Sequence, residues 1–266
     1  MKEEGALGLI DDAADAVGRL PEWVGLLWLT ALPARLLFAF LCIRLIQLGS
    51  DAVHYGDWTR RIAWLLLIAW LGSLWGRQVF VRACRHAFQS ERPAPRALLR
   101  VPAREMAGHL AAALAIEALF WALLLTFVAP PFLLVAAGLA AAAAPAGGPG
   151  PLDSLREVWR GVGPALRLIR LLILFGIAVP IAALNLHFFA HGVLWLAGGI
   201  PSLDVTGWDG VLALANPAYA VLLFTGACLL LEPVWLAALT AHVERVRVRG
   251  TGDDLRRWFA ELTVGS

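Results

Sequence analysis

The chain has 266 residues, of which 60% are hydrophobic and only 16% are charged. Soluble globular domains average about 25% charged residues, so this composition excludes an ordinary water-soluble protein. The formal net charge of +2 is uninformative as a sum, because the charges are segregated along the chain.

The first segment, residues 5–20, has the apolar spacing of an amphipathic helix. Because Pro21 follows it, we expect this helix to end there and to lie in the membrane surface without crossing it. Four apolar residues share its predicted face: Leu7, Ile10, Ala14 and Val17.

Six apolar stretches follow, and they predict an all-α polytopic membrane helix bundle with about six transmembrane helices. A spanning helix needs about 20 mainly apolar residues to cross a hydrocarbon core about 30 Å thick. The fourth stretch is short and rich in alanine, so its sequence leaves open whether it crosses or dips in and returns. The stretches are 23–48, 63–81, 109–128, 131–144, 171–196 and 221–241.

Arginines gather in the regions 77–104, 156–170 and 245–257, whereas 129–131 and 198–210 contain no basic residue. Basic loops favour the cytoplasmic side, so this pattern predicts a multi-pass inner-membrane protein with both termini in the cytoplasm. The high arginine, alanine and glycine content is typical of a GC-rich bacterial genome.

We therefore expect one integral membrane domain over residues 1–266, with an amphipathic helix at 1–22, a bundle at 23–244 and an amphipathic cytoplasmic tail at 245–266. Two further amphipathic segments, 96–106 and 152–169, are predicted to lie in the membrane plane on the cytoplasmic side.

Ionisable residues at membrane depth are the candidate functional residues. A charge in the middle of a bilayer costs at least about 2.5–3.5 kcal/mol, so it normally faces a partner or water. Pairing two arginines with two glutamates inside the bundle would serve either as a packing lock or as a polar path for a substrate or proton. Arg44 has the alternative of snorkelling to the outer surface. The predicted buried polar residues, which form a possible substrate site, are Arg35, Arg44, Glu117, Asn185 and Glu232.

His187 and His191 are four residues apart, so on a helix they share a face and have the spacing of two metal ligands. No third ligand follows in sequence, so a polar patch at the membrane surface is the favoured interpretation. We predict no metal site and no cofactor. No catalytic motif is present, so no catalytic residue is predicted.

Three segments carry a resemblance to a known group: LGLIDDAADAVGRLPEWVGLLWLTALP, LREVWRGVGPALRLIRLLILF and EPVWLAALTAHVERVRVRGTGDDLRRW. The chain resembles poorly characterised bacterial multi-pass membrane proteins related to the membrane domain attached to some glycerophosphodiester phosphodiesterases. Ala241 and His242 depart from the tyrosine and aspartate of that group. The residues that match its outline are Pro233, Trp235, Arg245, Arg247, Arg249, Gly250, Asp254 and Leu255.

The resemblance implies a six-span inner-membrane protein that works with other envelope proteins, and it implies no catalysis. We expect a non-enzymatic assembly or interaction module. The alternative is a transporter or lipid-handling protein with a central Arg/Glu site. The expected partners are the lipid bilayer, anionic lipids at the cytoplasmic face and an envelope protein, with no nucleic acid.

Overall fold

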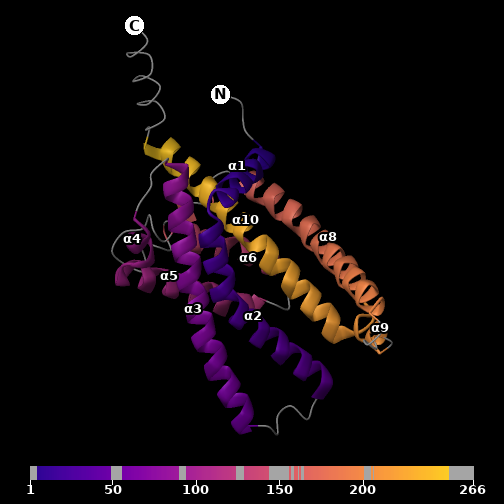
Figure 1. Cartoon of the computed structure of the whole chain (residues 1–266). Helices are drawn as coiled ribbons and strands as arrows, with labels where there is room; N and C mark the ends of the chain where they lie inside the picture. Colours follow the sequence, from indigo (N-terminus) through magenta and orange to yellow (C-terminus); the bar gives the residue numbers. More distant parts are fainter. Residues whose placement is uncertain are drawn as a thin grey trace. The chain divides into compact units, whose positions relative to one another are not determined.

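The structure, a computed structural model, describes residues 5–48, 56–89, 94–123, 129–143, 156, 159–160, 162, 165–200, 205 and 207–251. Every regular element among these residues is a helix, which confirms the predicted all-α fold class for this part of the chain (Figure 1). In chain order the helices are α1 (Ala6–Gly18), α2 (Pro21–Leu48), α3 (Gly56–Phe88), α4 (Pro95–Leu99), α5 (Ala103–Leu123), α6 (Ala129–Ala143), α8 (Ala165–Gly198), α9 (Trp208–Val211) and α10 (Pro217–Thr251).

Proline is the first residue of three of these helices, α2, α4 and α10. Proline suits this position because the first helical N–H groups have no partner within the helix, so its missing N–H costs nothing. At α10 the side-chain oxygen of Asn216 accepts a hydrogen bond from the N–H of Ala218, at 3.1 Å, and so caps the helix start. The predicted break at Pro21 is confirmed, since α1 ends at Gly18 and α2 begins at Pro21.

Four helices in the described part of the chain are long and apolar enough to cross a membrane. They correspond to the first, second, fifth and sixth predicted stretches. The first begins two residues before its predicted start, and the other three extend beyond the predicted bounds at both ends. This finding supports a membrane protein. The helical segments are Pro21–Arg44, Arg60–Phe88, Leu166–Gly198 and Pro217–Val248.

A count of exactly six spans is not borne out in the described residues, because α5 and α6 are not among the helices that qualify there. Helix α6 has 15 residues, which at about 1.5 Å per residue gives roughly 22 Å, less than the hydrocarbon thickness. Helix α5 has 21 residues, among which are Arg104, Glu105, His109 and Glu117. These two helices pack against each other.

The chain divides into two compact units. Unit 1 comprises Met1–Leu27, Leu74–Leu172 and Val234–Ser266, and unit 2 comprises Trp28–Ser73 and Ile173–Pro233. Helices α2, α3, α8 and α10 contribute residues to both units.

Unit 1 has a dense core made from segments of α3, α6 and α10. All residues from Leu236 to Glu244 of α10 are buried, as are those from Gly138 to Ala143 of α6, so these stretches have no exposed face. A Cβ atom added to Gly138 would clash with Cδ1 of Leu239 and would lie 2.9 Å from Nε1 of Trp235. The missing side chain therefore lets α6 approach α10 closely, as small residues do between membrane helices.

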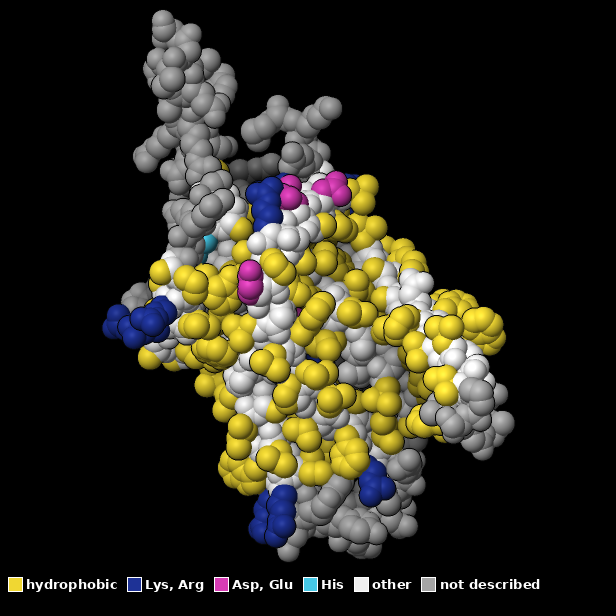
Figure 2. All heavy atoms as spheres, viewed as in Figure 1, with side chains coloured by type: hydrophobic (Ala, Val, Ile, Leu, Met, Phe, Trp, Pro, Cys, Tyr) yellow, Lys and Arg dark blue, Asp and Glu magenta, His cyan; other side chains and the backbone are white. Residues whose placement is uncertain are grey.

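Unit 2 leaves large apolar side chains exposed along its helix segments. Figure 2 shows hydrophobic side chains over much of the visible surface, with few charged ones among them. An exposed apolar surface of this extent marks a surface that contacts lipid or another protein. Examples from three helices are Phe38, Trp64, Ile68, Ile177 and Phe188.

The face of α1 that is buried against protein lies one position away from the predicted apolar face. The buried residues are Ala6, Leu9, Ala13 and Ala16, whereas Leu7 is 67% exposed and Ala14 is exposed. The buried face is mostly alanine, which allows close packing on protein, and the larger side chain of Leu7 is left outside. Amphipathic spacing located the helix but not the side that packs.

The predicted in-plane segment 96–106 is divided between α4 and the start of α5. Half of the predicted segment 152–169 lies outside the described residues, and residues 165–169 begin α8. The tail from residue 252 onward also lies outside the described residues, while residues 245–251 continue α10.

Candidate functional sites

The first polar site joins α2 to α10 within unit 2. The guanidinium Nη2 of Arg35 donates to Oε2 of Glu232 at 2.9 Å. The side chain of Glu232 is 5% exposed and that of Arg35 is 31% exposed. The expected pairing of an arginine with a glutamate is present at this position. A charge-assisted hydrogen bond of this kind holds two helices in register, because breaking it leaves one charge unpaired.

A second contact between the same two helices involves a proline. Pro233 has no N–H, so it cannot bond the carbonyl of Leu229 four residues before it. The indole Nε1–H of Trp28 donates to that carbonyl oxygen at 2.9 Å. Neighbouring side chains often satisfy carbonyls that proline frees inside membrane helices. Trp28 was not predicted as a site residue, although Pro233 indicated that the carbonyl of Leu229 needed a hydrogen-bond donor from elsewhere.

The other predicted members of this polar site do not join it. Arg44, Glu117 and Asn185 are exposed, so the expectation that they are buried is wrong. The Cζ of Arg44 lies 5.8 Å from the ring centroid of Phe40, in a cation–π geometry. Glu117 is five residues after the buried Ala112, and at about 100° per residue it is turned roughly 140° from that buried position.

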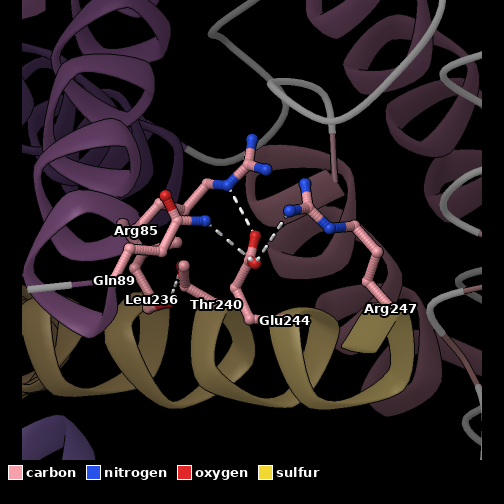
Figure 3. A network of polar contacts seen from close by, with 6 residues as sticks. All are labelled: Arg85, Gln89, Leu236, Thr240, Glu244 and Arg247. Carbon is pink, nitrogen blue, oxygen red and sulfur yellow. Dashed lines mark hydrogen bonds and ion pairs between the residues drawn. The ribbon is translucent and has the colours of Figure 1, made fainter. Parts of the chain in front are cut away.

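A larger polar network, shown in Figure 3, lies in unit 1 around Glu244 of α10. From α3, Nε of Arg85 donates to Oε1 of Glu244 at 2.6 Å, and Nε2 of Gln89, at the end of that helix, donates to Oε2 at 3.4 Å. From the next turn of α10, Nη2 of Arg247 lies 3.7 Å from the same carboxylate. Glu244 was not among the predicted site residues, since it was placed at the end of the bundle and the arginines after it in a cytoplasmic tail; a glutamate directly before Arg245, Arg247 and Arg249 was the available signal.

Two further contacts tie unit 1 together. Arg245 of α10 forms an ion pair with Asp12 of α1. Gln78 of α3 is fully buried, and its Nε2 donates to the carbonyl of Ala141 at 3.1 Å. That carbonyl belongs to the last described turn of α6, which covers Ala129–Ala143. Gln78 therefore joins α3 to this turn of α6.

The third candidate site lies in unit 2, where His187 and His191 of α8 meet Tyr219 of α10. The ring centroids of the two histidines are 4.2 Å apart, and those of His187 and Tyr219 are 5.7 Å apart. Nδ1 of His187 is 3.1 Å from the tyrosine hydroxyl, and Nδ1 of His191 is 3.1 Å from the carbonyl oxygen of His187. No group of three or more His, Cys, Asp or Glu residues arranged to hold a metal ion occurs among the described residues.

Comparison with known proteins adds no relative. No family model matches the chain, and neither a curated protein nor a solved structure shows significant similarity to it. The resemblance to the membrane domain of glycerophosphodiester phosphodiesterases therefore stays a prediction.

Proposed function

We propose that this chain is a multi-pass protein of the bacterial cytoplasmic membrane, that it is not an enzyme, and that it serves as an assembly module for other envelope proteins. The observation that carries the proposal is that ionisable residues within its long apolar helices are used to join those helices to one another. Arg35 is bound to Glu232, and Arg85 is bound to Glu244. Contacts of this kind build a fixed scaffold.

The topology that we propose has four spans, formed by α2, α3, α8 and α10, with both termini in the cytoplasm. Two arguments support it. The four helices are long and apolar enough to cross, whereas α6, which packs against α5 between the second and third of them, has only 15 residues. Most basic residues of the chain lie in or beyond the C-terminal parts of α3 and α10, or before and at the start of α8, as expected for cytoplasmic connections.

A cytoplasmic surface for anionic lipid or a partner follows from this topology. Helix α4 and the residues after it present Arg96, Leu99, Arg100 and Arg104, all of them exposed. We name these four residues the α4 patch. Nη1 of Arg82 donates to the carbonyl of Arg100 at 2.9 Å, which holds this segment against α3. Arginines near an anionic leaflet gain about 1 kcal/mol each.

The alternative function is lipid handling or transport at the Arg35–Glu232 pair. One observation favours it, namely that the side chain of Arg35 is 31% exposed although it lies within a span. A guanidinium at that depth is stabilised by water or by an anionic headgroup.

Native mass spectrometry of the full chain in lipid nanodiscs tests both functions. The assembly module predicts a protein partner at fixed stoichiometry, retained in Glu232→Gln and lost when Arg96 and Arg100 are both changed to Glu. Lipid handling predicts a bound lipid or small molecule that is lost in Arg35→Ala. Glu117→Gln is the matched control, because Glu117 is exposed and lies in the other unit. Absence of any protein partner in the wild type would contradict the assembly module.

A further inference from the structure

His187 and His191 lie one helical turn apart on the same face of α8, with ring centroids 4.2 Å apart. Each ring has one nitrogen in a hydrogen bond, and in both rings it is Nδ1. The Nε2 atoms make no hydrogen bond to any residue in the part of the chain that the structure describes. Both rings are only partly buried, so these two nitrogens are open to an external ligand.

The hydrogen bond of His191 determines which nitrogen carries the proton. Its partner, the carbonyl oxygen of His187, can only accept, so Nδ1 of His191 must donate. In the neutral ring the lone pair is then on Nε2, the form that binds a metal ion. The hydroxyl of Tyr219 can accept in the same way from Nδ1 of His187. Metal-binding histidines usually donate their second ring N–H to an oxygen of this kind, which orients the ring.

We propose that Nε2 of His187 and Nε2 of His191 bind one divalent transition-metal ion, with Tyr219 orienting the first imidazole. Imidazole nitrogen suits Zn²⁺, Cu²⁺ and Ni²⁺. Two protein ligands leave the remaining coordination positions to water or to a ligand from outside, as at an open metal site. Tyr219 is in the first turn of α10, so the site lies where that helix begins, far along the chain from its basic end.

The test uses the full chain in nanodiscs, titrated with Cu²⁺ and observed by electron paramagnetic resonance. The expected result is one tightly bound ion per chain with two imidazole nitrogens in its coordination plane. His187→Asn and His191→Asn should each lower the affinity by about tenfold or more and leave one coordinating nitrogen. Tyr219→Phe keeps the aromatic ring but removes the oxygen, and it should weaken binding by roughly tenfold while keeping both nitrogens.

His86→Asn and Asn185→Ala are the controls, since one removes a histidine outside the site and the other removes a neighbouring polar side chain on α8. Both should bind Cu²⁺ as the wild type does. Binding that survives in the His187 and His191 variants, or a spectrum without two imidazole nitrogens in the wild type, would overturn the proposal. If a histidine variant fails to fold, the spectrum of the wild type and the Cu²⁺ affinity of Tyr219→Phe still decide whether the two histidines bind the ion.

Discussion

The indole N–H of Trp28 on α2 donates a hydrogen bond to the carbonyl oxygen of Leu229 on α10, at 2.9 Å. It replaces the backbone N–H that Pro233 lacks. A proline inside a helix normally costs about 3 kcal/mol, in part because one carbonyl loses its partner. Here a side chain from another helix supplies that partner. The turn of α10 that contains Pro233 is therefore also the place where α2 is hydrogen-bonded to α10.

Trp28→Phe should lower the free energy of unfolding by about 1–2 kcal/mol, because the carbonyl of Leu229 then has no donor. Thermal unfolding in detergent measures the change. The control is the same substitution in a Pro233→Ala background, where the restored N–H of residue 233 can bond that carbonyl. The loss should shrink there. An equal loss in both backgrounds would show that Trp28 acts through packing alone.

Because Arg35 and Glu232 form a pair, the losses in the free energy of unfolding from changing each of them should not add up in the double variant. Glu232→Gln or Arg35→Met alone removes one charge of the pair and leaves the other within an apolar helix, and each should cost about 2–4 kcal/mol. Changing both residues removes the charges together, so the double variant should be more stable than the sum of the single losses predicts. Unfolding curves of all four proteins give the coupling energy directly. Strict additivity would mean that the two side chains do not stabilise each other.

Gly138→Ala should destabilise unit 1 by roughly 1–3 kcal/mol, the usual cost of overpacking a core. The added methyl group would meet Leu239 and Trp235 at distances that real Cβ atoms do not adopt. Gly25→Ala is the matched control, since that helical glycine has nothing within 4 Å of an added Cβ. The Gly25→Ala variant should be as stable as the wild type or more stable by up to about 1 kcal/mol. A comparison of the two midpoints of thermal unfolding decides between close packing and a general intolerance of alanine.

Sequence reasoning located the four long helices because each is a run of apolar residues with few charges, a property that the sequence alone displays. It overcounted the spans, because apolar composition does not distinguish a helix buried in protein from one that faces lipid. Helix α6 is an example: Leu139 and Ala140 are buried against protein, yet they are as apolar as lipid-facing residues.

The sequence predicted only some of the residues of the candidate site, for a related reason. A charge in an apolar run signals a partner, and this identified Arg35 and Glu232. Which partner, and whether a given charge is buried at all, depends on the rotation of each helix about its axis. That rotation is set by packing, so Glu117 on α5 was wrongly expected to face inward. The network of Glu244 escaped notice because its arginines look like ordinary loop charges until α3 and α10 are brought together.

Glu244→Gln should destabilise the protein by about 2–3 kcal/mol, because Arg85 would lose its charged partner in a largely buried place. Glu117→Gln makes the same chemical change at an exposed position of α5 and should leave stability within about 0.5 kcal/mol of the wild type. Thermal unfolding of the two variants, measured side by side, separates the network from a general effect of removing a negative charge. Similar losses in both variants would argue against the network.

The four-span topology makes a prediction that a six-span topology reverses. A reporter fused after Leu123, at the end of α5, should be cytoplasmic if α5 does not cross and periplasmic if it does. Green fluorescent protein fluoresces only in the first case, and alkaline phosphatase is active only in the second. Fusions after Phe88 and after Gly198 are the controls, because the two topologies agree that the first is cytoplasmic and the second periplasmic. Phosphatase activity after Leu123 would restore the six-span arrangement. In that case α6 would have to return through the membrane with only 15 described helical residues, which requires local thinning of the bilayer.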